Sequence, residues 1–315
     1  MARIYVVLAT YNGEKYLSKM LDSLMAQSRP ADKIIAVDDG SKDRTPEILK
    51  SYQDALPLQI TCLEKNSGHR AAFSRALEIA QPQLADDDLI ALADQDDVWL
   101  PQKLDQLEKA IATTKASLAF GDAEVINGDG QIIAPSWQKF SGIEKRVSIL
   151  QQIAGINNVT GCTSIFKASL LSSVLPIPEG VTVHDRWIAI IAEKNDGIAT
   201  IDMPVIQYRI HGENAVGGAT EKSMRKTIEE RIRWVGTLLV HKERIRLTDE
   251  ETRFAVELKA QAEERLHKKI MLSKLLWNFA HRKELFLKDS PVRTFKRVLF
   301  SVIGLPLASR LFGKN

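Results

Sequence analysis

The chain has 315 residues, 44% of them apolar and 26% charged, enough for one large domain with an appendage or for two domains. Its two cysteines, Cys62 and Cys162, lie far apart in apolar stretches, which indicates reduced core residues in a cytosolic protein and excludes a zinc motif. Strand-like sequence starts at Arg3 with no charged and then apolar leader before it, so we expect no signal peptide.

The net charge of +3 hides a strong asymmetry along the chain. Residues 1–220 carry 21 Lys or Arg against 28 Asp or Glu, whereas residues 221–315 carry 22 against 12. The basic part is expected to face an anionic membrane or an acidic partner, and we expect no nucleic-acid partner.

Strand-like and helix-like segments alternate in the first third of the chain. The apolar patterns predict strands at 4–9, 34–37, 58–63 and 89–93, separated by helices at 14–27, from 45 and at 69–80. This alternation is typical of an α/β fold with a mostly parallel sheet flanked by helices. Neither GxGxxG after the first strand nor GxxxxGK[ST] occurs, which argues against a dinucleotide-binding enzyme and a P-loop NTPase. The acidic run 86–88 is predicted to be a solvated turn.

The pattern changes after about residue 221. Glycine becomes rare, and apolar residues at helical spacing predict long helices at about 221–246 and 249–287, then a shorter basic helix after Pro291. Apolar and basic residues alternate on that last helix, which fits either an interfacial amphipathic segment or a terminal helix docked on its own domain. We predict a catalytic domain over 1–218 and a helical basic region over 219–315.

The stretch LIALADQDDVWLP at 89–101 carries the main chemical signal. Asp94, Asp96 and Asp97 follow a short buried strand, and three carboxylates so close together repel one another unless a cation shares the site. Open α/β sheets bind their ligands at the carboxyl ends of the parallel strands. Hard cations such as Mg²⁺ prefer oxygen ligands, which carboxylates supply. The residues alone predict a metal–diphosphate site or an acidic solvated loop.

An ordered set of motifs resembles family 2 glycosyltransferases with the GT-A fold, and it covers about residues 2–218. The narrower variants ADQDDVW, HDRW and YRxHGxN resemble the bacterial branch that includes rhamnosyltransferases of surface-polysaccharide assembly. The matching segments are VVLATYNGEKYL (6–17), VDDGSKDRT (37–45), NSGHRAAFSRAL (66–77), ADQDDVWLPQKL (93–104), GCTSIFK (161–167), HDRW (184–187) and QYRIHGENAVG (207–217).

The resemblance implies a Mg²⁺ or Mn²⁺ ion held by Asp94, Asp96 and His211, with Asp94 contacting the donor's ribose as the alternative. Without that context, His211 after a strand would be a structural histidine. Asp97 would orient the acceptor or fix its loop, and Arg209 would contact phosphate oxygens or face solvent.

Asp185 of HDRW matches the family's catalytic base, and helix N-capping is the alternative role. A single base with no second nucleophilic carboxylate implies inversion of the anomeric configuration, by analogy with inverting glycosidases. Trp187 would stack on a sugar or lie in the core.

The nucleoside end of the donor matches Thr10, Tyr11, Asn12 and Asp39, with Asp38 as an alternative to Asp39. A carboxylate that accepts the N3–H of uracil or thymine would favour a UDP- or dTDP-sugar.

The leading hypothesis is therefore an inverting, metal-dependent glycosyltransferase that extends a glycan or lipid-linked glycan, either in the cytoplasm or peripherally at the inner face of the cytoplasmic membrane. One alternative is an inactive family member that serves as an assembly or membrane-docking subunit, against which the carboxylates at 94, 96 and 185 argue. The other is a sugar nucleotidyltransferase, although residues 10–14 lack its glycine- and lysine-rich loop.

Overall fold

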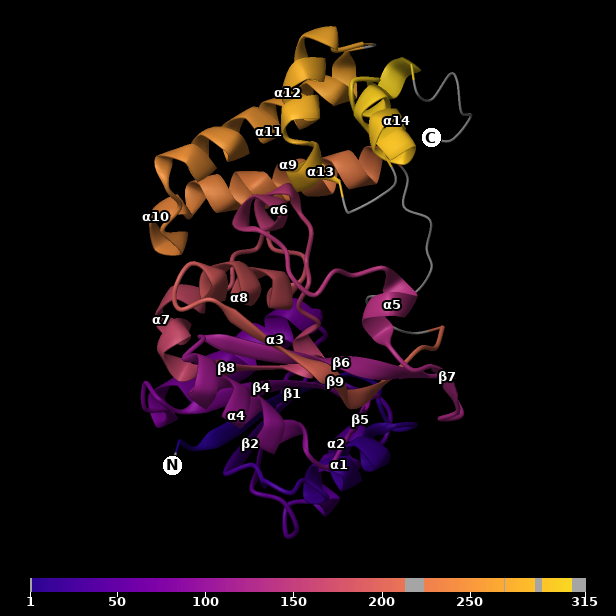
Figure 1. Cartoon of the computed structure of the whole chain (residues 1–315). Helices are drawn as coiled ribbons and strands as arrows, with labels where there is room; N and C mark the ends of the chain where they lie inside the picture. Colours follow the sequence, from indigo (N-terminus) through magenta and orange to yellow (C-terminus); the bar gives the residue numbers. More distant parts are fainter. Residues whose placement is uncertain (1, 213–223, 269, 287–290, 308–315) are drawn as a thin grey trace. The chain divides into compact units, whose positions relative to one another are not determined.

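The first part of the chain forms a nine-stranded mixed sheet with helices packed against it (Figure 1). The computed structural model describes residues 2–212, 224–268, 270–286 and 291–307. The strands follow one another across the sheet as β3 (Leu58–Cys62), β2 (Lys33–Asp38), β1 (Ile4–Thr10), β4 (Leu89–Asp94), β8 (Ser164–Lys167), β6 (Leu118–Ile126), β9 (Ile198–Arg209) and β5 (Val98–Trp99), with β7 (Ile132–Ala134) paired to β6.

The first four strands are parallel, as the βα alternation predicts. Beyond β4 the sheet becomes mixed, because β8 runs antiparallel to both β4 and β6, while β6 and β9 are parallel. The predicted fold class, a GT-A-like α/β sheet flanked by helices, is confirmed. The helices of this part are α1 (Leu17–Met25), α2 (Thr45–Ser51), α3 (His69–Ala80), α4 (Lys103–Thr114), α5 (Trp137–Ser141), α7 (Leu171–Val174) and α8 (His184–Glu193).

The parallel strands β1, β2 and β4 are buried almost throughout, and alternate residues along them face one core cluster. Val6 and Leu8 of β1, Ala91 of β4 and Ile34 of β2 are fully buried in one cluster with the apolar face of α1. That face contains Leu17, Met20, Leu21 and Leu24, spaced at three and four residues as a helix requires. The core therefore holds the carboxyl ends of β1, β2 and β4 in fixed register.

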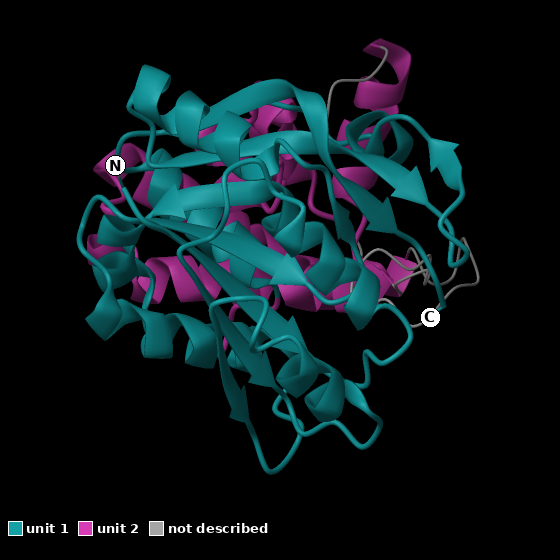
Figure 2. Ribbon diagram, turned by 90° about the horizontal axis from the view of Figure 1, so that it is seen from below, with its two compact units in different colours: residues 1–145, 159–178, 183–218 teal, residues 146–158, 179–182, 219–315 magenta. Residues whose placement is uncertain are grey.

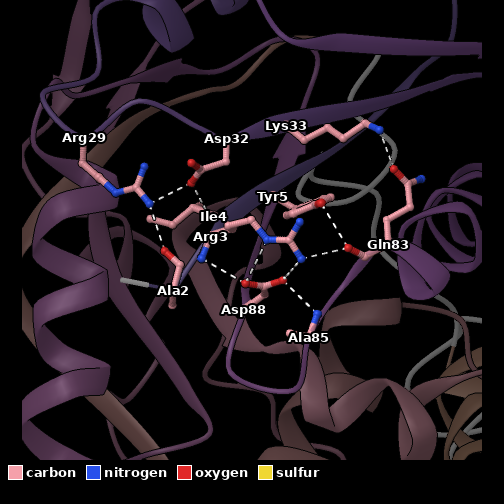
Figure 3. A network of polar contacts seen from close by, with 10 residues as sticks. All are labelled: Ala2, Arg3, Ile4, Tyr5, Arg29, Asp32, Lys33, Gln83, Ala85 and Asp88. Carbon is pink, nitrogen blue, oxygen red and sulfur yellow. Dashed lines mark hydrogen bonds and ion pairs between the residues drawn. The ribbon is translucent and has the colours of Figure 1, made fainter.

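Asp88, at the amino end of β4, belongs to a polar network (Figure 3). It is 4% exposed and accepts hydrogen bonds from the Arg3 backbone at 3.0 Å, the Arg3 guanidinium at 2.6 Å and the Ala85 backbone at 2.8 Å. These donors lower the pKa of Asp88 against the opposing effect of its burial. The prediction of a solvated turn is therefore wrong for Asp88, because it ties the start of β1 to the start of β4.

The chain divides into two compact units (Figure 2). Unit 1 consists of residues 1–145, 159–178 and 183–218, and unit 2 of residues 146–158, 179–182 and 219–315. Two short segments inside the predicted catalytic domain, 146–158 and 179–182, thus belong to the second unit.

Unit 2 is helical. Its elements are α6 (Ile149–Ala154), α9 (Met224–Val240), α10 (Lys242–Ile245), α11 (Asp249–His267), α12 (Leu275–Ala280), α13 (Arg282–Leu285) and α14 (Pro291–Ser301). The single helix predicted over 249–287 is wrong: α11 ends at His267, and the backbone of Lys268 is extended. Met271 is buried, and its N–H donates to the Val302 carbonyl at 2.9 Å, so a contact with the far end of the chain stops the helix. Among the helices described, none is both long and apolar enough to cross a bilayer.

Candidate functional site

The carboxyl ends of β1, β2 and β4 bring three of the predicted polar clusters to one edge of the sheet. In the parallel pairing, Thr10 lies opposite Asp38, and Ala9 lies opposite Asp94. Asp39 follows Asp38 directly, and residues 95–97 follow Asp94. The clusters at 10–12, 38–39 and 94–97 are therefore neighbours, as expected for a ligand site at this edge.

Gln95 joins two of these loops. Its side chain accepts the Tyr11 N–H at 2.8 Å and donates to the Tyr11 carbonyl at 2.9 Å. A Cβ at Gly13 would lie 2.2 Å from the Gln95 Oε1, so any other residue at this position would displace the Gln95 amide from its present place. Asn12 adopts a left-handed φ of 47°, and the Tyr11 side chain is 42% exposed.

Asp38 and Asp39 point to different partners. Asp38 accepts hydrogen bonds from the Thr10 hydroxyl at 2.9 Å and the Ser41 N–H at 2.9 Å, so it fixes the turn after β2. Asp39 accepts the N–H groups of Ser67 and Gly68, both at 2.8 Å, one on each oxygen. A carboxylate has about four acceptor positions, so Asp39 retains acceptor capacity after holding this loop.

A buried polar cluster lies beneath the acidic loop. Oxygens of Asp94 and Asp97 and the Sγ of Cys162 all lie within 4.8 Å of one another. Lys103 is 1% exposed; its Nζ donates to the Cys162 carbonyl at 2.6 Å and lies 3.1 Å from the centre of the Trp99 ring. Lys103 is therefore buried within electrostatic range of Asp94 and Asp97.

The crowding changes the protonation of this cluster. Burial, with the Asp96 and Asp185 charges, raises the pKa of Asp94 to about 7. Burial and the neighbouring carboxylates raise the pKa of Asp97 well above its usual range. Burial lowers the pKa of Lys103 to about 7 against the attraction of both carboxylates. Such perturbed groups gather at functional sites more often than elsewhere.

Asp96 and His211 meet directly, with 2.8 Å between Oδ2 and Nε2. The imidazole also packs on Tyr16, with 5.0 Å between the ring centres.

Arg209 has a different environment from the one predicted. It is 1% exposed, and its guanidinium donates to the backbone carbonyls of Asp96 at 2.7 Å, Asn127 at 3.0 Å and Gly128 at 3.2 Å. The backbone N–H of Arg209 donates to the Asp97 carboxyl group at 3.0 Å. The predicted solvent-facing role is therefore wrong, because the guanidinium is buried and shapes the acidic loop. Phosphate contact by Arg209 stays a prediction.

Asp185 lies in the first turn of α8, and its Oδ2 accepts the Gly161 N–H at 3.1 Å. The N-cap of α8 is Val183, which makes no side-chain capping bond, so the N-cap alternative for Asp185 is wrong. A Cβ at Gly161 would be 3.3 Å from the Asp185 Cβ, so glycine gives this carboxylate room. The charge of Asp185 contributes to the raised pKa of Asp94, so the two carboxyl groups lie close enough to interact.

Trp187 is fully buried, and its Nε1 donates to the Val174 carbonyl at 2.9 Å. The predicted sugar-stacking role is wrong, because the ring has no accessible face. The helical spacing of Trp187 with Ile190 and Ile191 is the sequence signal for this core position.

Three aromatic rings other than Trp187 form a row that runs from the acidic cluster toward solvent. Tyr208 is close enough for the charges of Asp94, Asp96 and Asp97 to raise its pKa, although burial is the larger cause. Trp137 packs on Tyr208 with 4.7 Å between ring centres, and its Nε1 donates to the Thr160 hydroxyl at 3.2 Å. Phe140 stacks on Trp137 at 6.1 Å and is 55% exposed.

The model of the family described as Glycosyl transferase family 2 matches residues 5–175. The chain belongs to this family. The identification rests on more than half of the sequence and agrees with the fold and the acidic edge described above.

Curated relatives of this glycosyltransferase are moderately similar to it. An uncharacterised glycosyltransferase of Nostoc sp. is 27% identical over 217 residues, which span 67% of this chain and 66% of that protein. A putative teichuronic acid biosynthesis glycosyltransferase of Bacillus subtilis is 26% identical over 71% of this chain and 85% of its own. A dTDP-rhamnosyl transferase of Shigella flexneri is 28% identical over 67% and 73%.

Solved structures agree at the level of the fold. Staphylococcus aureus TarS 1–349 in complex with UDP-GlcNAc matches with a TM-score of 0.60 and 20% identity, over 95% of this chain and 81% of that one. A mannosyltransferase from Pyrobaculum calidifontis in complex with GDP-Man and Mn²⁺ matches with a TM-score of 0.53 and 18% identity, over 99% and 88%.

Several residues of the glycosyltransferase site were not singled out from the sequence. Gln95 and Lys103 lie inside the ADQDDVWLPQKL motif, so their place in that motif was the available signal. Cys162 lies in GCTSIFK and Tyr208 in QYRIHGENAVG, so the same signal was available for both. Trp137 lies in none of the matching segments, and only the folded chain brings it beside Tyr208.

Proposed function

We propose that the chain is an inverting, metal-dependent glycosyltransferase that moves a sugar from a UDP- or dTDP-linked donor to a hydroxyl of a surface glycan. The observation that carries the proposal is the convergence of Asp94, Asp96, Asp97 and Asp185 on one sheet edge with raised pKa values at Asp94 and Asp97. A divalent cation bound at this edge would stabilise the crowded carboxylates and would also bind the diphosphate of the donor.

The donor set at this edge suits a divalent cation. Asp96 and His211 offer an oxygen and an imidazole nitrogen in contact, and Asp94 adds a carboxylate nearby. Carboxylate with imidazole fits Mn²⁺, and carboxylate alone fits Mg²⁺. When bound, such an ion acts as a Lewis acid that stabilises charge on the departing diphosphate.

The residues of the chain supply the other parts of the reaction. The Gly161 N–H orients Asp185, whose carboxylate takes the proton from the acceptor hydroxyl as that oxygen attacks the anomeric carbon. A single displacement with one base inverts the anomeric centre. Asp39, held by the β3–α3 loop, accepts the N3–H of a pyrimidine base, and Thr10, Tyr11 and Asn12 line the same end.

The acceptor side lies along the row of Tyr208, Trp137 and Phe140. The row leads from the acidic cluster to solvent, and Trp137 contacts Thr160, the neighbour of the glycine that orients Asp185. Aromatic faces pack well against the C–H faces of pyranose rings, which makes the exposed Phe140 a stacking position for the acceptor sugar.

Two relatives point to surface glycans and to pyrimidine donors. The Shigella flexneri relative is a dTDP-rhamnosyl transferase, and a Staphylococcus aureus relative, TarS, is a poly(ribitol-phosphate) β-N-acetylglucosaminyltransferase. A dTDP-rhamnose donor is the narrower form of the proposal. A lipid-linked acceptor would place the enzyme at the inner face of the cytoplasmic membrane.

A thermal-shift panel tests the donor site. UDP, dTDP, GDP, CDP and ADP are compared with and without Mn²⁺ on wild type and Asp96→Asn, because a ligand that binds only the folded state stabilises it. The proposal expects UDP or dTDP to raise the melting temperature only when metal and Asp96 are both present. No metal-dependent shift with any nucleotide would reject it and favour an assembly subunit without activity.

A further inference from the structure

Unit 2 exposes an unusual amount of apolar side chain over a short stretch. Among the described residues, eight of the sixteen large apolar side chains that are exposed fall within residues 270–300, about a tenth of the chain. They are Ile270, Leu272, Leu276, Phe279, Val292, Phe295, Leu299 and Phe300, and we call them the 270–300 apolar patch. Soluble proteins rarely concentrate apolar side chains in this way unless something covers them.

The first stripe lies on α12 and the turn before it. Leu272, Leu276 and Phe279 are spaced by four and three residues, which places them on one helical face, and they are 69%, 83% and 49% exposed. The opposite side of α12 is well packed: Asn278 is 2% exposed and donates to the Ser301 hydroxyl at 2.8 Å. One side of α12 therefore packs on the rest of unit 2, and the apolar stripe on its other side stays exposed.

The second stripe lies on α14, which packs beside α12. Val298 and Val302 are buried, whereas Val292, Phe295 and Leu299, spaced by three and four residues, are 66%, 56% and 40% exposed. On the next part of the helix circumference, the helical spacing gathers Arg293, Lys296 and Arg297 around Phe300. The helix thus presents in turn a buried side, an exposed apolar side and a basic side.

The net positive charge around the 270–300 apolar patch indicates which kind of partner covers it. Residues 267–302 contain nine Lys or Arg and two Asp or Glu. Exposed apolar stripes flanked by basic side chains fit the interface of an anionic bilayer, where the apolar groups enter the acyl boundary and the basic groups meet lipid headgroups. A neutral apolar partner would gain nothing from this charge, and a second copy of the same surface would be repelled by it.

We propose that the 270–300 apolar patch is a peripheral docking surface for an anionic lipid bilayer, formed jointly by α12 and α14. The sequence pattern on the last helix suggested only α14, while the α12 stripe emerges from the fold. The surface lies wholly in unit 2, so its role does not depend on which sugar the site in unit 1 transfers.

Vesicle co-sedimentation of the full chain tests the proposal. The probes are vesicles of phosphatidylcholine alone and vesicles with 30 mol% phosphatidylglycerol, at low salt and at about 150 mM salt, where the Debye length is about 8 Å. Wild type is expected to bind the anionic vesicles, more weakly as salt rises. The double variant Leu276→Ser with Phe295→Ser should bind at least tenfold more weakly, a loss of about 1.4 kcal/mol.

Matched variants separate the patch from general effects. Val240→Ser with Val256→Ser removes two apolar side chains that are 78% and 53% exposed outside the patch, and binding should stay at the wild-type level. Lys283→Gln with Lys296→Gln should weaken binding and flatten its salt dependence.

Three outcomes would overturn the proposal. One is equal vesicle binding by wild type and the Leu276→Ser, Phe295→Ser variant, with both folded by circular dichroism. Another is no binding of wild type to anionic vesicles. The third is a dimer in sedimentation velocity that the same double substitution dissolves, which would make the patch an interface between copies. Nucleotide binding in unit 1 should be unchanged by the double substitution, so failure here and failure of the proposed function are distinguishable.

Discussion

Replacing Asp94 by asparagine should make the fold less sensitive to alkaline pH, at the expense of the site. The pKa of Asp94 is raised to about 7 from an ordinary value of 3.8, so the folded state holds this proton more tightly than the unfolded chain does. The stability from that proton is therefore complete below about pH 4 and is lost as pH rises through 7. An asparagine side chain at this position would keep the shape of the carboxyl group but would not ionise.

The structure sets the size of this effect. Between pH 5 and pH 6 the unfolded carboxyl is ionised and the folded one mostly is not, so stability falls by about 1.4 kcal/mol per pH unit. Because the folded carboxyl is itself half ionised at pH 7, the loss from pH 5 to pH 7 is about 2.3 kcal/mol in all. The advantage of Asp94→Asn over wild type should grow by about that amount across this range, somewhat reduced because Lys103 loses a charged neighbour.

Urea unfolding at pH 5, 6, 7 and 8, followed by tryptophan fluorescence, measures the advantage directly. Asp129→Asn, in the turn between β6 and β7, is the matched control and should run parallel to wild type. Parallel curves for Asp94→Asn and wild type would refute the reasoning, because they would show that Asp94 ionises in the fold as readily as in the unfolded chain.

Three further substitutions probe the other parts of the site. Asp185→Asn should lower kcat for transfer by about 10²- to 10⁴-fold while nucleotide binding persists, and near-normal turnover would remove Asp185 as the base. Lys103→Met should lower the unfolding free energy by about 3 kcal/mol, because it removes the buried hydrogen bond to the Cys162 carbonyl and the positive charge near the acidic cluster, whereas Lys109→Met at an exposed ion pair should change it by less than about 0.5 kcal/mol. Equal losses would contradict the buried-cation assignment. Phe140→Ala should raise the KM for the acceptor about threefold to tenfold without changing the KM for the donor, and an unchanged acceptor KM would place the acceptor elsewhere.

The position of the acidic edge was predictable from the sequence, because it follows from local patterns. Short apolar runs that end in polar residues define β1, β2 and β4, and parallel pairing then brings their ends together. Thr10, Asp38 and Asp94 therefore lie where the sequence predicts them. Their roles toward a nucleotide and a metal stay predictions.

The surroundings of that edge were not predictable, because they depend on contacts between distant segments. The sequence left phosphate contact and a solvent-facing side chain open for Arg209 and gave no role to Lys103. The fold buries both side chains, Arg209 against three backbone carbonyls and Lys103 beside Cys162. Trp187 and Trp137 are equally suited to sugar stacking by residue type, and only packing separates the core ring from the ring in the outward row.

The prediction of one long helix over residues 249–287 was wrong for a related reason. Residues 249–287 have continuous helical periodicity, yet the pairing of Ile270 with Ile303 interrupts it. A periodic pattern records which residues can share a helical face, but it does not record a partner that arrives from about thirty residues further along.

The most direct test of the central claim is a crystal of the full chain grown with UDP and Mn²⁺, examined by anomalous scattering from manganese. The account predicts one strong anomalous peak at the carboxyl edge of the sheet, coordinated by Asp96 and by diphosphate oxygens, with His211 or Asp94 completing the protein ligands. Bound UDP with no manganese at this edge, or manganese bound away from Asp94 and Asp96, would contradict the claim that these carboxylates hold the metal of a glycosyl-transfer site.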